Sequence, residues 1–247
     1  MNLMTVVNNI HLAAGCVSLL TFTIPMFAPK GGRIHRTVGW IFVSAIGVLC
    51  VTGVPMTLVS LAAEQTSEGQ ARRAFLLLLT LLSGASTWKG IRVLRFKGAE
   101  RHSHLGDLGV SLCLMMCGAV IAVLGLQFRS GLLGFFGVGS VLVGLHDFRY
   151  WRNPAKGRMH WFFEHMGGMI GSSVGALTAF SALGGRRFGL APFGMLSWIL
   201  PSVVMGVIAV VWIGYYRRRF DARRDPTAAP SGPATPTVFQ SEAMAEQ

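Results

Sequence analysis

Long apolar stretches constrain the fold of this chain more than any other feature. A helix needs about 20 mainly apolar residues to cross the hydrocarbon core of a membrane, and seven stretches meet or approach that length. They are Val6–Phe27, Val38–Ala62, Ala74–Trp88, Leu108–Leu126, Leu132–Leu145, Trp161–Leu183 and Pro192–Tyr216. We therefore predict an all-α integral membrane bundle of seven transmembrane helices.

Two of the seven stretches are short as bare apolar runs. The third must extend to Val93, and the fifth to Tyr150, in order to span the membrane. The fifth stretch also contains four glycines, and glycine is a poor helix former. Elsewhere, Gly167, Gly171 and Gly175 recur at every fourth position. Their spacing predicts close packing of the sixth helix against a neighbour.

The basic residues predict how the helices are oriented. The chain of 247 residues has 22 Lys and Arg against 10 Asp and Glu, which gives a formal net charge of +12. When they are counted between the seven stretches, 17 of the 22 basic residues fall on one side of the membrane and 5 on the other. Loops rich in Lys and Arg stay in the cytoplasm. The N-terminus is therefore predicted to lie outside and the C-terminus inside a bacterial inner membrane.

The same composition argues against a nucleic-acid partner. Proteins that bind nucleic acid are often strongly basic, but they are also rich in charge, and only 13% of these residues are charged. Membrane lipids are the predicted partners instead. The first stretch follows a segment without basic residues or a small-residue cleavage site, so we predict that it is retained. We predict a transmembrane domain over residues 1–220 and a disordered cytoplasmic tail, rich in Pro, Ala, Thr and Ser, over residues 221–247.

Side chains that could carry chemistry gather toward the predicted inner side. Six of the seven histidines fall there, and so do three acids. They are His35, His102, His104, His146, His160, His165, Asp107, Asp147 and Glu164. Ionisable groups at membrane depth are costly and usually functional. The four cysteines lie within apolar stretches without a CxxC pair and are interpreted as core residues.

The first interpretation of this inner layer is a metal or haem site. Each of the three large cytoplasmic loops contains Lys-Gly followed shortly by a histidine, beginning at Lys30, Lys97 and Lys156. Neutral imidazoles that converge from several helices can bind a transition metal or haem b. The candidate metal ligands are His35, His102, His104, His146, His165, Asp147 and Glu164. Among them, His35, His146 and His165 are the candidate cofactor ligands.

Two further interpretations need no bound cofactor. Basic residues near helix ends can bind the phosphates of anionic lipids. The candidates for this role are Lys30, Arg33, Arg36, Lys97, Lys156 and Arg158. Alternatively, Asp147, Glu164 and His165 form part of a proton path in a transporter. The sequence has no GxSxG, HExxH or Walker motif and no dinucleotide fingerprint, so it indicates none of those catalytic classes.

Several motifs resemble an uncharacterised family of predicted bacterial multi-pass membrane proteins. The first stretch contains His11-x-x-x-Gly15, and the following loop reads Lys30-Gly31-Gly32-Arg33-x-His35-Arg36-x-x-Gly39. The sixth stretch contains Glu164-His165-Met166-x-x-Met169 and Ala176-x-Thr178-Ala179-Phe180. The resemblance implies a multi-pass membrane protein without an established activity. It draws attention to His11, Lys30, His35, Arg36, Gly39 and His165. Di-haem transmembrane cytochromes share a looser likeness, since their histidines also come from several helices.

Overall fold

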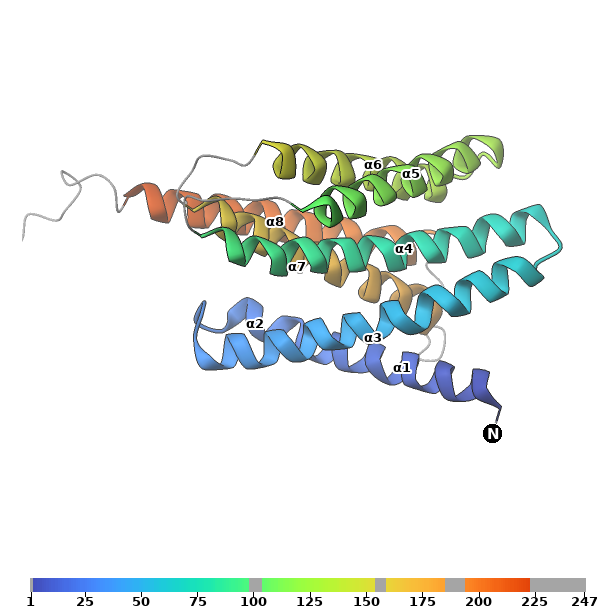
Figure 1. Cartoon of the computed structure of the whole chain (residues 1–247), viewed down its shortest axis with the longest axis horizontal. Helices are drawn as coiled ribbons and strands as arrows, with labels where there is room; N and C mark the ends of the chain where they lie inside the picture. Colours follow the sequence, from blue (N-terminus) through green and yellow to red (C-terminus); the bar gives the residue numbers. More distant parts are fainter. Residues whose placement is uncertain (1, 98–103, 154–158, 185–193, 223–247) are drawn as a thin grey trace, which may run out of the picture. The chain divides into compact units, whose positions relative to one another are not determined.

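We describe the fold from a computed structural model, which describes residues 2–97, 104–153, 159–184 and 194–222. The chain divides into two compact units, Met1–Val210 and Val211–Gln247. The first unit contains nearly all of the helical bundle (Figure 1). In the second unit, only residues 211–222 are described, and they form the end of a helix. The predicted disordered tail, residues 221–247, begins within this helix, which ends at Ala222, and residues 223–247 lie outside the described residues.

The described part of the chain is helical and contains no β-strand. Helix α1 (Leu3–Thr21) and the short α2 (Thr23–Phe27) are followed by α3 (Arg33–Ala63) and α4 (Ser67–Arg92). A 3-10 turn, η1, covers Val93–Phe96. The remaining elements are α5 (Leu105–Gln127), α6 (Gly131–Arg152), α7 (His160–Ala179), the π-helical turn η2 (Phe180–Gly184) and α8 (Leu196–Ala222).

Among the described residues, six helical segments are long and apolar enough to cross a membrane. They are Leu3–Phe27, Arg33–Ala63, Ser67–Phe96, Leu105–Gln127, Gly131–Arg152 and Leu196–Phe220. Large apolar side chains also cover much of the outer surface; Val51 is 75% exposed and Leu126 is 81% exposed. Such a surface is stable only in an apolar solvent. The chain is therefore an all-α integral membrane protein, as predicted.

The sixth predicted stretch corresponds to α7 and η2, which are not among these six segments. Helix α7 is less apolar because it carries polar side chains that neighbouring helices bury. Ser172 and Thr178 have no exposed surface, and Ser173 is only 2% exposed. His160, Glu164 and His165 in the first turns lower the hydropathy of α7 further.

Helices of the first unit pack mainly in neighbouring pairs. Helix α5 packs along α6, α4 along α7, and α1 along α3, while α3 also packs against α4 (Figure 1). The central core lies between α4, α5 and α6, where Phe75, Leu78, Leu114, Ile121 and Phe136 are buried. Helix α4 is central to this arrangement, since it contacts α3, α5, α6 and α7.

Glycines allow the α5–α6 pair to approach closely. A Cβ atom on Gly137 would lie 2.4 Å from the backbone nitrogen of Ala122, and one on Gly125 would lie 2.6 Å from that of Gly134. These glycines therefore serve helix packing. The glycine-rich fifth stretch is a regular helix because its Gly137 and Gly144 face α5.

The α4–α7 pair uses a different set of glycines from the predicted one. Gly171 and Gly175 do face α4, but a Cβ on Gly167 would meet no atom within 4 Å. Gly168 takes its place, because a Cβ there would lie 2.7 Å from the carbonyl oxygen of Ser86 and 2.8 Å from the Cα of Gly90. The prediction of a glycine contact was therefore correct for α7, but its stripe was placed one residue early at the inner end.

Candidate functional site

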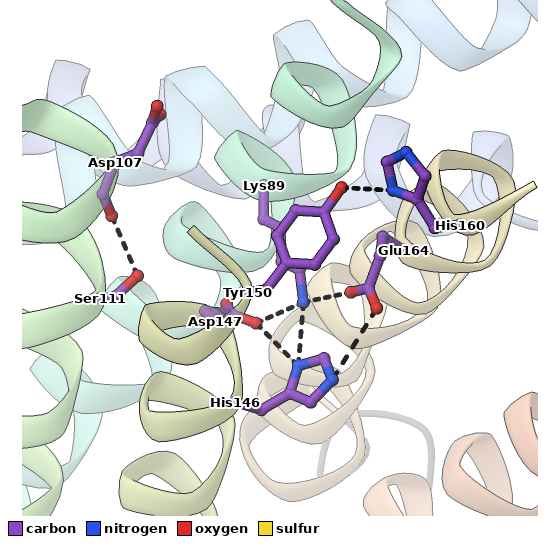
Figure 2. A network of polar contacts seen from close by, with 8 residues as sticks. All are labelled: Lys89, Asp107, Ser111, His146, Asp147, Tyr150, His160 and Glu164. Carbon is purple, nitrogen blue, oxygen red and sulfur yellow. Dashed lines mark hydrogen bonds and ion pairs between the residues drawn. The ribbon is translucent and has the colours of Figure 1, made fainter. Parts of the chain in front are cut away.

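A buried ammonium group joins three helices at the end of the bundle that the charge pattern assigns to the cytoplasm. Lys89 lies near the end of α4 and is only 6% exposed. Its Nζ donates to Oδ1 of Asp147 on α6 and lies 2.5 Å from Oε2 of Glu164 on α7 (Figure 2). A buried ammonium group is costly unless acidic groups surround it. Lys89 thus fixes the ends of α6 and α7 to α4.

His146 completes this group, which we call the Lys89 network (Lys89, His146, Asp147 and Glu164). Its Nδ1 lies 3.1 Å from Nζ of Lys89, and its Nε2 lies 3.8 Å from Oε1 of Glu164. The same Nδ1 also lies 3.3 Å from Oδ1 of Asp147, so this ring nitrogen faces both the cation and a carboxylate of the network.

A second polar contact links the end of α6 to the start of α7. The hydroxyl of Tyr150 on α6 lies 2.8 Å from Nδ1 of His160 at the start of α7 (Figure 2). The Tyr150 ring also lies 5.4 Å from Nζ of Lys89, which places a cation against the face of an aromatic ring. The contact between Tyr150 and His160 is therefore a further link between α6 and α7.

A different network links α4 to α5. Asp107, which has no exposed surface, accepts from Nε of Arg92 at 3.1 Å and from the indole nitrogen of Trp88 at 3.0 Å. Its second carboxylate oxygen accepts from the backbone nitrogen of His104 at 3.0 Å. The carboxylate thereby caps the first turn of α5 and neutralises Arg92. His104 itself is exposed and remains outside the Lys89 network.

The third group is a pair of imidazoles on α3 and α7. The ring centroids of His35 and His165 lie 6.2 Å apart, with an angle of 63° between the ring planes. The Nδ1 of His35 lies 3.0 Å from the carbonyl oxygen of Pro25, and that of His165 lies 2.7 Å from the carbonyl oxygen of Gly90. A carbonyl can only accept, so Nδ1 is the donor in each ring, and Nε2 is the ring nitrogen that could bind a ligand.

The predicted histidine cluster is therefore divided in the structure. His146, Asp147 and Glu164 lie together around Lys89, whereas His35 and His165 form a separate pair. The two carboxylates already hold a cation, because the Lys89 ammonium lies between them. In the described part of the chain, no group of three or more His, Cys, Asp or Glu side chains is arranged to hold a metal ion. His102 lies outside the described residues.

The candidate lipid-binding residues also differ in their surroundings. The ammonium of Lys30 donates to the carbonyl oxygens of Pro25 and Met26, and burial lowers the pKa of Lys30. Lys97 lies over the ring of Trp161, with 4.5 Å from Nζ to the ring centroid. Arg33 and Arg36 are exposed in the first turn of α3. Lys156 and Arg158 lie outside the described residues.

Sequence reasoning missed the roles of Lys89 and Arg92. It counted both among the basic residues of the third loop, although it also required the third helix to extend to Val93. In the structure α4 continues to Arg92, and the two side chains are 6% and 9% exposed. One signal was available in the sequence. Three acids were expected at the same level of the membrane, with only a loop arginine considered as a partner for Glu164, and buried acids require cations.

The fold defines the class of this chain as a helical integral membrane protein. Comparisons with known proteins add no narrower assignment. No protein-family model matches the sequence, and no curated protein or solved structure is significantly similar to it. The proposals below therefore depend on the geometry of the described residues.

Proposed function

We propose that this protein holds a haem b between His35 and His165 and acts in electron transfer within a bacterial cytoplasmic membrane. The observation that carries the proposal is the arrangement of the imidazole pair. The two rings come from different helices, their centroids are 6.2 Å apart, and backbone carbonyls fix both Nδ1 atoms. Metal-bound histidines commonly donate their second ring nitrogen to such an acceptor.

The separation of the rings supports two ligands on one metal atom. A metal–imidazole bond is about 2.1 Å long, so two imidazoles on opposite sides of one metal place their ring centres about 6 Å apart. Haem needs only axial ligands from the protein, because the macrocycle supplies the other four nitrogens. A pair of histidines is therefore sufficient for haem, whereas a bare metal ion requires more protein ligands.

Neighbouring residues also suit a planar group that carries carboxylates. Gly39 lies one helical turn after His35, and a Cβ at this position would meet no atom within 4 Å. Lys97 is near enough to act electrostatically on His165, and such a cation can pair with a haem carboxylate. These features give a physical reason for the His35-Arg36-x-x-Gly39 motif.

The protein's own residues define the chemistry of this site. His35 and His165 would hold the haem, which would supply one-electron transfer at this site. The Lys89 network fixes the end of α7 and so determines the position of His165, which follows Glu164 directly. The backbone carbonyls of Pro25 and Gly90 set the orientation of the two rings.

An absorption spectrum of the purified protein tests this proposal. We expect a Soret band and, after reduction, a sharp α band, with about one haem per chain. His35→Ala and His165→Ala should each lose the spectrum. His104→Ala is the matched control and should retain it, because His104 is exposed and lies outside both the imidazole pair and the Lys89 network. A protein that shows no Soret band even after titration with haem would overturn the proposal and favour the transport alternative, which the buried Lys89 network supports.

A further inference from the structure

We propose that one anionic phospholipid binds to the inner half of α1 and α3, with an acyl chain in the groove between the helices and its phosphate beside Arg33 and Arg36. This inference goes beyond the proposed electron transfer and does not depend on it. Its basis is an apolar groove whose α3 residues follow two exposed arginines in the first turn of the same helix.

The groove lies on the outer surface of the α1–α3 pair. Its cavity volume is 430 Å³, and its lining is almost entirely apolar. It is lined by Ala14 and Val17 of α1 and by Trp40, Ile41, Ser44 and Val48 of α3. Trp40 is 60% exposed, so its indole ring is available to a chain that lies in the groove.

The arginines continue the same stripe of α3 toward the membrane surface. At 100° per residue, Arg33, Trp40 and Ser44 fall within about 40° of one another. Arg33 and Ser44 are separated by about 16 Å along the helix axis. This length is close to half of the hydrocarbon core, about 15 Å. A lipid with its phosphate at Arg33 would therefore place its acyl chain in the groove.

The charges of this region favour an anionic headgroup. Arg33 and Arg36 are exposed, and within the described residues neither guanidinium forms an ion pair with an acid. Lys30 is less suitable than sequence reasoning suggested, because its ammonium donates to the carbonyls of Pro25 and Met26. The phosphate would thus be held by the two arginines.

The same charges argue against a second copy of this chain as the occupant. A symmetric dimer through this groove would bring identical surfaces together. It would place Arg33 and Arg36 of one chain near those of the other. Like charges at such an interface are unfavourable, whereas an anionic lipid neutralises them.

Quenching of Trp40 fluorescence by brominated lipids tests the proposal. The full chain is reconstituted in phosphatidylcholine vesicles that contain increasing amounts of brominated phosphatidylglycerol or brominated phosphatidylcholine. The Trp40 signal is the difference between the wild type and Trp40→Phe. All measurements are made in a His165→Ala background. This substitution removes haem, which would itself quench tryptophan fluorescence. Each arginine should contribute about a fivefold preference for the anionic lipid.

Matched variants separate this site from general surface charge. Arg33→Gln with Arg36→Gln should abolish the preference, while Arg72→Gln, an exposed arginine on α4, should leave it unchanged. Ser44→Phe, which fills the groove, should weaken it. Equal quenching of Trp40 by the two brominated lipids would overturn the proposal. So would a Trp40 signal protected from both lipids in a chain that cross-links as a dimer, because a second copy would then cover the groove.

Discussion

The ammonium of Lys89 neutralises charges on two other helices, so its loss should be costly. We expect Lys89→Met to lower the free energy of unfolding by about 3–5 kcal/mol, because it leaves the buried Asp147 and the half-buried Glu164 without their cation. Thermal unfolding in detergent, followed by the loss of monodisperse protein on size exclusion, measures this effect.

Removal of the whole ionic group provides the control for Lys89→Met. The triple variant Lys89→Met, Asp147→Asn, Glu164→Gln buries no unpaired charge and should recover much of the lost stability. Arg72→Met, at an exposed position of α4, should change stability little. If Lys89→Met were as stable as the wild type, the buried network would have no role in joining the helices.

Glu64 carries a residue-scale prediction for pH. Hydrogen bonds from the side chain and backbone of Thr66 lower the pKa of Glu64 below its ordinary value of 4.5. A pKa that is lower in the folded state than in the unfolded state stabilises the fold at pH values above the unfolded-state pKa. This contribution is lost as the pH falls through the folded-state pKa. The melting temperature of the wild type should therefore exceed that of Glu64→Gln at pH above 4.5, and the difference should shrink below it. A difference that persists unchanged under acid would contradict this account.

Individual residues show how far the sequence could predict the site. The level of Asp147, Glu164 and the histidines in the membrane could be inferred, because helix length and position determine it. The division of these residues between the Lys89 network and the His35–His165 pair could not be inferred, since it depends on the rotation of α7 about its axis. Glu164 and His165 are adjacent in sequence, yet a helix turns about 100° per residue, so they contact different neighbours.

At the scale of helices, two adjacent glycines of α7 provide a matched pair of variants. Gly168→Ala should destabilise the protein by about 1–3 kcal/mol, because its Cβ would lie 2.7–2.8 Å from backbone atoms of α4. Gly167→Ala meets no atom within 4 Å and should be neutral or slightly stabilising, since alanine is the better helix former. Thermal unfolding of both variants in the same detergent measures the difference. Equal effects would contradict the observed face of α7.

The helices could be predicted from the lengths of the apolar stretches, but the exact ends of the helices could not. The third stretch was predicted from Ala74 and had to extend to Val93. Helix α4 does continue to Arg92, but it begins earlier, at Ser67. The bare apolar run ends at the first charges. Here, Lys89 and Arg92 remain helical because partners on other helices neutralise them. Such partners become visible only once the helices are packed.

For the whole molecule, the number of membrane crossings depends on α7. The described helices include six apolar segments without it. The charge pattern nevertheless predicts that α7 also crosses. If it did not, the loops before and after it would share one side, and the basic tail would move to the opposite one. The split of basic residues would then fall from 17 against 5 to 14 against 8, which weakens the orientation signal.

Reporters fused to the two termini distinguish these topologies. Seven crossings place the termini on opposite sides of the membrane, and six place them on the same side. We expect a fluorescent protein that folds only in the cytoplasm to be active at the C-terminus, and alkaline phosphatase, which requires an oxidising compartment, to be inactive there. A protease site before Leu3 should be cleaved from outside in intact cells. Fusions in the loop at Arg129, predicted to lie outside, are the control for insertion of the first helices. Termini on the same side with that loop still outside would show that α7 does not cross, even though the Lys89 network joins it to two apolar helices.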